Sequence, residues 1–169
     1  MQSTVTPYIT VKGAARAIDF YKSVFGAVES GARYTEPGGR VGHAEIAIGG
    51  ARIMLSDEHP EIGVLSPETL RGTPLTLHVQ VADAAATVAR AAAAGAKVLR
   101  AVQDQPYGER SGSIQDPFGH RWMVATPIEE VSKDELQKRV AKAWYASIPE
   151  RYRWAAKGRR GQDYGRQGR

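Results

Sequence analysis

The stretch His43-Ala44-Glu45 and a separate histidine, His78, are the features of this sequence best suited to chemistry. Residues two apart in a β-strand project from the same face, so His43 and Glu45 can share a proton or hold an ion together with His78. Hydrogen bonding to the wall of a site, or to a ligand, is the other role open to these side chains. His43, Glu45 and His78 are therefore the candidate catalytic residues.

Composition excludes several classes of function. The 169 residues include no cysteine, so disulfides, thiol nucleophiles and thiolate-bound metal centres are absent. No apolar run approaches the roughly 18 residues of a membrane helix, and the first residues do not resemble a secretory signal. We therefore expect a cytoplasmic protein with no membrane partner.

Positive charge is concentrated at one end of the chain. The net charge is +5, and the whole excess lies in residues 148–169. A nucleic-acid-binding protein needs a basic face on its folded part, so we do not expect nucleic acid as a partner. Recruitment of nucleic acid or of another protein by this basic tail is the remaining alternative.

An internal duplication indicates where the candidate residues lie. Three stretches recur in the same order about 70 residues apart: VKGAA (11–15) with VADAA (81–85), GA (26–27) with GA (95–96), and GARIML (50–55) with GHRWMV (119–124). In the first copy, apolar periodicity predicts a strand over 5–11, a helix over 14–25, and strands over 28–35, 41–48 and 51–56. The second copy predicts strands over 75–81, 97–103, 111–115 and 120–125, with a helix over 83–94.

The predicted fold class is α+β, with two βαβββ modules that form a cleft. Modules 1–56 and 74–126 make one domain, 1–126, and residues 57–73 link them. Residues 127–147 add a C-terminal helix with a capping box at Ser132 and Glu135, and 148–169 form the tail.

The paired modules, Phe20-Tyr21 in the first helix and the turn DPFG (116–119) together resemble the vicinal oxygen chelate superfamily, which includes glyoxalase I, extradiol dioxygenases and bleomycin-binding proteins. PYITV (7–11), HAE (43–45), MLSDE (54–58) and YGERSG (107–112) are typical of its PhnB-like branch. The resemblance spans residues 4–126. It implies curved sheets that wrap a cleft, helices on the outer faces, and a homodimer that completes the cleft across a two-fold interface.

Metalloenzymes of this superfamily bind their ion through His or Glu on the first and last strand of each module. The matching positions here hold Thr6 and Thr76 on the first strands and Met54 and Met123 on the last. Threonine hydroxyls and thioethers are poor ligands for hard or borderline divalent ions. We therefore predict that the family metal site is absent and that the protein has no cofactor.

Side-chain alternation predicts what lines the cleft instead. Apolar residues should face the helices, which leaves aromatic, sulfur-containing and charged side chains on the other face. The predicted ligand-binding residues are Tyr8, Thr10, His43, Glu45, Arg52, Met54, His78, Tyr107, Arg121 and Met123. This lining suits a medium-sized organic ligand better than a bare ion.

Some of these residues have a purely structural alternative. The two methionines can be packing residues, and Arg52 and Arg121 can form salt bridges at strand edges instead of capturing an anion. The loop that carries Tyr107 and Arg110 can be a surface hairpin instead of a lid. The same alternation turns His120 toward the helix, which predicts a structural role.

The leading hypothesis is a protein that binds a small organic molecule without the family metal, and sequestration of an antibiotic or a similar aromatic compound is a candidate role. The alternative is a lyase or isomerase that uses His43, Glu45 and His78, with or without a displaced metal. Whether the protein is an enzyme stays open, although the residues at the metal positions argue against it.

Overall fold

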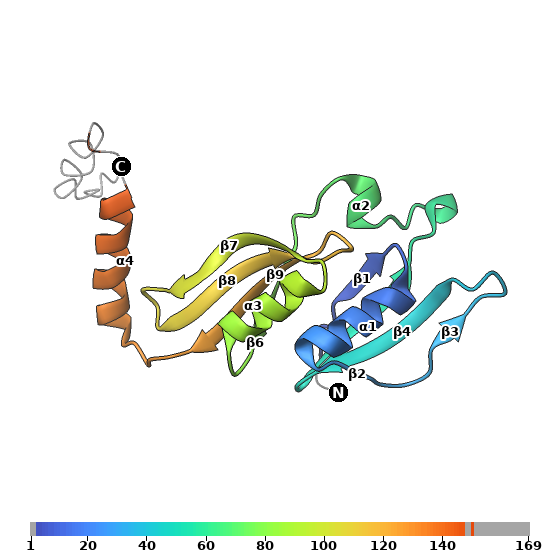
Figure 1. The fold of residues 1–169 in the computed structure, drawn as a ribbon, viewed down its shortest axis with the longest axis horizontal. Coiled ribbons are helices and arrows are strands. Elements are labelled where there is room, and N and C mark those ends of the chain that lie inside the picture. Colours follow the sequence, from blue (N-terminus) through green and yellow to red (C-terminus); the bar gives the residue numbers. More distant parts are fainter. Residues whose placement is uncertain (1–2, 148–149, 151–169) are drawn as a thin grey trace, which may run out of the picture.

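A computed structural model describes residues 3–147 and 150, so the predicted basic tail lies outside the described residues apart from Glu150. The first module has a five-stranded sheet and one long helix (Figure 1). Its elements are β1 (Tyr8–Val11), α1 (Ala14–Phe25), β2 (Val28–Glu29), β3 (Tyr34–Thr35), β4 (Val41–Ile48) and β5 (Ala51–Asp57). β1 runs parallel to β5, and β4 pairs antiparallel with β5, β2 and β3. The strand predicted over 28–35 is two short strands, because the chain turns at Gly31 with a φ of 83°.

The second module repeats this arrangement with four strands. Its elements are β6 (Thr76–Gln80), α3 (Ala84–Ala93), β7 (Lys97–Asp104), β8 (Glu109–Gln115) and β9 (Arg121–Pro127), in the sheet order β6-β9-β8-β7. The linker contains a 3-10 turn, η1 (Pro60–Ile62), and a short helix, α2 (Pro67–Leu70). The two predicted βαβββ modules are confirmed.

The C-terminal helix, α4 (Lys133–Ser147), is also confirmed, although it begins at Lys133 instead of near residue 127. The Ser132 hydroxyl accepts a hydrogen bond from the Glu135 backbone N–H at 3.3 Å, as the capping box requires. None of the helices in the described residues is long and apolar enough to cross a membrane.

Both module helices are capped from the last strand of their own sheet. The Asp57 carboxylate accepts hydrogen bonds from the backbone N–H groups of Gly13 and Ala14, at 2.7 and 2.9 Å, at the start of α1. In the second module the Thr126 hydroxyl accepts from the Ala84 N–H at 2.8 Å, at the start of α3. The first N–H groups of a helix have no partner within it, so these contacts fix each helix on its sheet.

A buried carboxylate, Asp116, joins the two modules. Its Oδ2 accepts hydrogen bonds from the Tyr21 hydroxyl of α1 at 2.8 Å and from the Trp122 indole of β9 at 2.9 Å. Its Oδ1 accepts from the backbone N–H groups of Phe118 and His120. Aromatic rings from both modules pack around this contact, including Phe25 at 4.6 Å from the Trp122 ring. The turn DPFG therefore holds the second module against α1.

The predicted side-chain alternation is confirmed within the strands, but Val5 and Leu75, which were expected on the buried side, precede β1 and β6 and are exposed. The buried side of the strands carries Ile9, Val11, Ile53, Leu55, Leu77, Val79, Trp122 and Val124, all less than a tenth exposed. α1 and α3 lie next to each other on one side of the molecule (Figure 1), and the Arg90 guanidinium of α3 donates to the Val24 carbonyl of α1 at 2.8 Å. The strand faces opposite the helices therefore lie beside each other on the other side.

Candidate functional site

The strand face of module 1 carries five of the predicted residues: Tyr8, Thr10, His43, Glu45 and Met54. Strand register aligns three of them in a row, because Met54 on β5 lies beside Tyr8 on β1 and beside Glu45 on β4. Met54 is half-buried and lies outside the buried core, so packing in the core does not account for it. A thioether between a phenol ring and a carboxylate gives this face both apolar and polar contact points.

A chain of polar contacts crosses the strand face of module 1. The Tyr8 hydroxyl lies 3.0 Å from His43 Nδ1, and the two ring centroids are 5.6 Å apart. His43 Nε2 lies 3.5 Å from Glu45 Oε1, and Arg52 Nη1 lies 3.3 Å from Glu45 Oε2. A histidine between a phenol and a carboxylate can relay a proton or hydrogen-bond a ligand. Arg52 forms an ion pair with Glu45, as expected if its role is structural and it does not capture an anionic ligand.

A cavity of about 520 Å³ opens on the same face. It is lined by the predicted residues Tyr8 and Thr10 and by Tyr34, Glu36, Gly42, Ser56, His59, Ile62 and Val64. His59 Nε2 lies 2.8 Å from Glu36 Oε1, and this hydrogen bond lowers the pKa of the Glu36 carboxyl. The sequence did not single out Tyr34, Glu36 or His59, because β3 and the linker approach β1 only through the tertiary fold.

The strand face of module 2 carries His78, Gln80, Ser111, Ser113 and Met123. His78 on β6 and Ser113 on β8 both lie beside Met123 on β9, so this row is the counterpart of the row around Met54. His78 Nε2 lies 3.7 Å from Glu109 Oε2, and the Gln80 amide donates to the other Glu109 oxygen at 3.4 Å. Arg121 lies at the exposed start of β9.

The loop predicted over 103–110 is a tight hairpin between β7 and β8, with Arg110 already in β8. Arg110 donates to Asp104 on the facing strand at 2.6 and 3.2 Å. This contact agrees with a surface hairpin, which was the alternative to a lid. The Gly108 carbonyl accepts from the N–H groups of Ile128 and Glu129, so the hairpin tip is tied to the segment before α4. This clamp positions Tyr107, whose hydroxyl lies 3.5 Å from the Ser111 hydroxyl.

The three candidate catalytic residues fall into two groups. His43 and Glu45 contact each other on module 1, whereas His78 contacts Glu109 on module 2. Among residues 3–147 no hydrogen bond or ion pair joins the two groups. One chain therefore does not assemble the predicted set into a single catalytic site.

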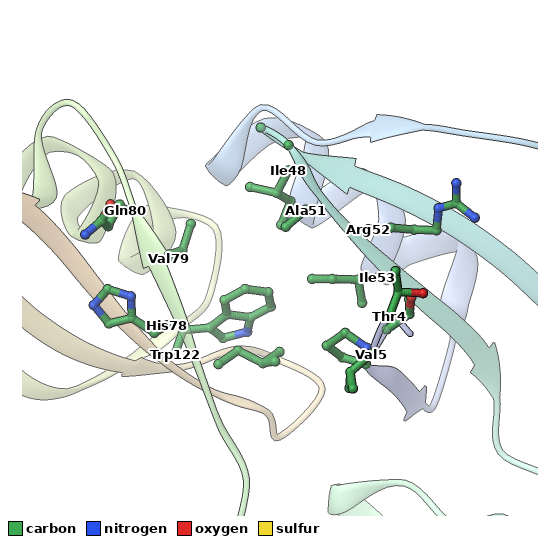
Figure 2. A pocket seen from close by; sticks show the side chains of 15 residues that line it. Thr4, Val5, Ile48, Ala51, Arg52, Ile53, His78, Val79, Gln80 and Trp122 are labelled. Carbon is green, nitrogen blue, oxygen red and sulfur yellow. The ribbon is translucent and has the colours of Figure 1, made fainter. Parts of the chain in front are cut away.

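A cleft of about 830 Å³ separates the two modules at their junction. In Figure 2, Trp122 reaches toward the first module and Ile53 reaches toward the second, whereas the His78 ring points away from the first module. Arg52 and His78, both from the predicted ligand set, line this cleft from opposite sides, and Thr6 lines it as well.

His120 lies at the same junction, under the DPFG turn. It is 5% exposed, and its Nε2 lies 3.0 Å from the Thr10 carbonyl oxygen of β1. A carbonyl only accepts, so Nε2 carries the proton and donates it. The predicted structural role of His120 agrees with this buried contact between modules.

Comparison with known proteins identifies the family. The model of the Glyoxalase/Bleomycin resistance protein/Dioxygenase superfamily matches residues 3–124. The chain belongs to this superfamily. Among curated proteins, the uncharacterized protein Rv0887c of Mycobacterium tuberculosis is 42% identical over 140 residues, which cover 81% of this chain and 82% of that protein.

Two solved structures show a similar fold. The Arabidopsis thaliana gene product At5g48480 is 28% identical with a TM-score of 0.58, over 74% of this chain and 99% of that chain. The PhnB protein of Bacillus cereus is 22% identical with a TM-score of 0.56, over 73% and 99%. The predicted resemblance to the superfamily and to PhnB-like proteins is confirmed.

The residues at the superfamily's metal positions do not fit a divalent ion. Thr6 and Thr76 offer neutral hydroxyls, and Met54 and Met123 offer thioethers, which suit soft ions. Within the described ranges, no three His, Asp or Glu side chains converge elsewhere as a metal site. That the protein lacks the family metal stays a prediction, and it rests on the chemistry of these four side chains.

Proposed function

We propose that this superfamily member binds a medium-sized, partly aromatic organic ligand on its strand faces, without the family metal. The observation that carries the proposal is the row of Tyr8, Met54 and Glu45 beside a cavity of about 520 Å³. Ligand cavities of this size are typically apolar with a few fixed polar groups. Tyr34, Ile62 and Val64 supply the apolar wall of this cavity, and Thr10, Glu36 and His59 supply polar groups. His43 and Glu45 lie beside it and are joined to it through the contact between His43 and Tyr8.

Aromatic and thioether side chains suit a planar ligand. Tyr8 is 51% exposed and Tyr34 is 61% exposed, so both rings offer apolar area that a ligand can cover. Burial of such a compound lowers its free concentration without any covalent chemistry. Sequestration of an antibiotic or a similar aromatic compound is therefore the biological role we propose for this site.

A second copy of the chain completes the site in this proposal. The two strand faces of one chain lie beside each other instead of facing each other, so a ligand on either face stays open to solvent. A two-fold axis that places module 1 of one copy over module 2 of the other would enclose it and bring His43 and Glu45 near the partner's His78. Isologous interfaces of this kind are the commonest form of closed oligomer.

The first test is ligand binding by the full chain. The midpoint of thermal unfolding is measured against a panel of planar aromatic compounds that includes bleomycin, and at least one compound should raise it. Tyr8→Ala should weaken that compound's binding by at least about tenfold, because a buried aromatic contact is lost. The matched control, Leu70→Ala on exposed α2, should leave binding unchanged. No stabilising compound, or equal losses in both variants, would refute the proposal.

A metal-dependent or acid–base enzyme is the second candidate, and the contact chain Tyr8–His43–Glu45 favours it. Elemental analysis of the purified protein separates the candidates. One tightly bound equivalent of a divalent metal that is lost in a His43→Ala/Glu45→Ala variant would establish the enzyme site and overturn the metal-free proposal. A protein without metal that binds its ligand equally well in the variant would rule out this role for the pair.

A further inference from the structure

The guanidinium of Arg100 lies on the strand face of module 2 without a counter-charge. Its Nη2 donates to the Ser111 hydroxyl at 3.3 Å and approaches the Met123 thioether at 3.8 Å. Its Nε is buried and has no hydrogen-bond partner. A guanidinium has five N–H donors, and here only one of its three nitrogens contacts an acceptor, so the protein's own hydrogen bonds do not explain this position.

The setting of Arg100 differs from that of other arginines in the described ranges. Arg52 pairs with Glu45, Arg110 with Asp104, and Arg139 with both Glu129 and Glu135. Of the arginines in residues 3–147, those other than Arg100 that form no ion pair are exposed to solvent: Arg16, Arg71, Arg90 and Arg121. Arg100 is half-buried and takes part in no ion pair there. A partly desolvated cation beside only a neutral hydroxyl and a thioether is unfavourable until an anion joins it.

Hydroxyl groups and a thioether surround the Arg100 guanidinium. The Gly108 clamp fixes Tyr107 beside Ser111, so two hydroxyls and the guanidinium gather in one place. Glu109 is the nearby carboxylate on β8, and it already contacts His78 and Gln80. Met123 supplies an apolar floor next to the charge, where the body of an organic ligand can lie.

We infer that Arg100 is the anchor for a carboxylate group, and that the ligand of this protein is an aromatic carboxylic acid. This inference rests on the proposed ligand-binding function and names the class of ligand. The Nη1 and Nη2 edge of the guanidinium matches the two oxygens of a carboxylate, and the exposed Tyr107 adds a hydroxyl donor. The buried Ser111 holds the guanidinium in place by accepting from Nη2. One guanidinium balances one negative charge, which favours a carboxylate over a doubly charged phosphate.

The experiment is isothermal titration calorimetry of the full chain with 2-naphthoate, its neutral analogue 2-naphthamide, and inorganic phosphate. 2-Naphthoate should bind roughly 10- to 100-fold more tightly than 2-naphthamide, because only its carboxylate carries a negative charge and two oxygens that can form a bidentate ion pair with the guanidinium. Arg100→Met should abolish this preference, and Arg100→Lys should retain part of it. The matched control, Arg16→Gln on the exposed side of α1, should keep it.

Thermal unfolding separates a ligand anchor from a structural residue. Because Arg100 is an uncompensated cation, Arg100→Met should leave the unfolding midpoint unchanged or raise it. A clear drop in the midpoint of both Arg100→Met and Arg100→Lys would assign Arg100 to structure and overturn the inference.

The binding data also distinguish this inference from the proposed function. Equal affinity for 2-naphthoate and 2-naphthamide would leave an aromatic site standing and overturn the carboxylate anchor. Phosphate that binds as tightly as 2-naphthoate would also overturn it, because the site would then recognise a bare anion. If neither naphthalene compound binds although a neutral compound of the panel raises the midpoint of thermal unfolding, the inference fails and the proposed function stands. If no compound of the panel raises the midpoint, both fail.

Discussion

Replacement of Asp116 by asparagine removes one charge at the junction of the modules and changes almost no volume. The carboxylate is 3% exposed and accepts four hydrogen bonds, two on each oxygen. A carboxamide has one acceptor oxygen, and its NH₂ group must then face two of the former donors. Tyr21 can rotate its hydroxyl and accept, but the Trp122 indole N–H can only donate. At least one buried N–H therefore loses its partner.

The expected loss of unfolding free energy in Asp116→Asn is about 3 kcal/mol. An unsatisfied buried donor costs about 1–3 kcal/mol, and the remaining bonds lose the extra strength that an ionised acceptor gives. Tyr21→Phe removes only one donor and leaves the carboxylate with three partners, so we expect a loss of about 2 kcal/mol. In a double-mutant cycle the two changes should not add, because they act on the same contact.

Urea denaturation followed by tryptophan fluorescence measures these losses, since Trp122 lies in the cluster. The control is Asp104→Asn, an exposed carboxylate paired with Arg110, for which we expect a loss below about 1 kcal/mol. If Asp116→Asn is no more destabilising than this control, or if its effect adds fully to that of Tyr21→Phe, Asp116 does not join the modules as described.

Three further predictions concern other contacts. Burial raises the pKa of Tyr21 well above its ordinary value, so the unfolded chain releases this proton at a lower pH than the folded chain does. The free energy of unfolding should therefore fall above pH about 10, by up to about 1.4 kcal/mol per pH unit. Tyr21→Phe should reduce this slope in urea denaturation at pH 9 to 11, and an unchanged slope would show that Tyr21 is not its source. Hydrogen bonds, chiefly from the Thr69 hydroxyl, lower the pKa of Glu58 to about 2, so the free energy of unfolding should fall as the pH drops from near 4.5 toward 2. In Glu58→Gln, acid denaturation should show a smaller loss of stability over this pH range. A Cβ at Gly108 would collide with the Glu129 carbonyl oxygen, so Gly108→Ala should lower the midpoint of thermal unfolding, and an unchanged midpoint would mean that the clamp is not required.

Local patterns predicted the fold well because both modules repeat the same signals. Gly26 ends α1 with a φ of 68°, and the Asp83 carboxylate caps α3 by accepting from the Ala86 N–H. Both signals are readable from neighbouring residues alone. The alternation of apolar residues likewise predicted which side of each sheet is buried.

The site was only partly predictable because it depends on contacts between distant segments. Tyr8, His43 and Glu45 were predicted on one face, and the structure brings them together. His78 was expected to join them, but it lies in the other module, and one chain keeps the modules side by side. Arg100 could not be assigned to a face, since irregular pairing on both sides of it in β7 shifts the alternation.

The central claim is that ligands bind on the strand faces opposite the helices. Amide chemical-shift mapping by NMR tests it most directly, with the full chain and the aromatic compound that most raises the midpoint of thermal unfolding. We expect shifts concentrated on β1, β4 and β5, around Tyr8 and Met54, and on β6 and β9, around His78 and Met123. Shifts confined to the outer surfaces of α1 and α3 would contradict it.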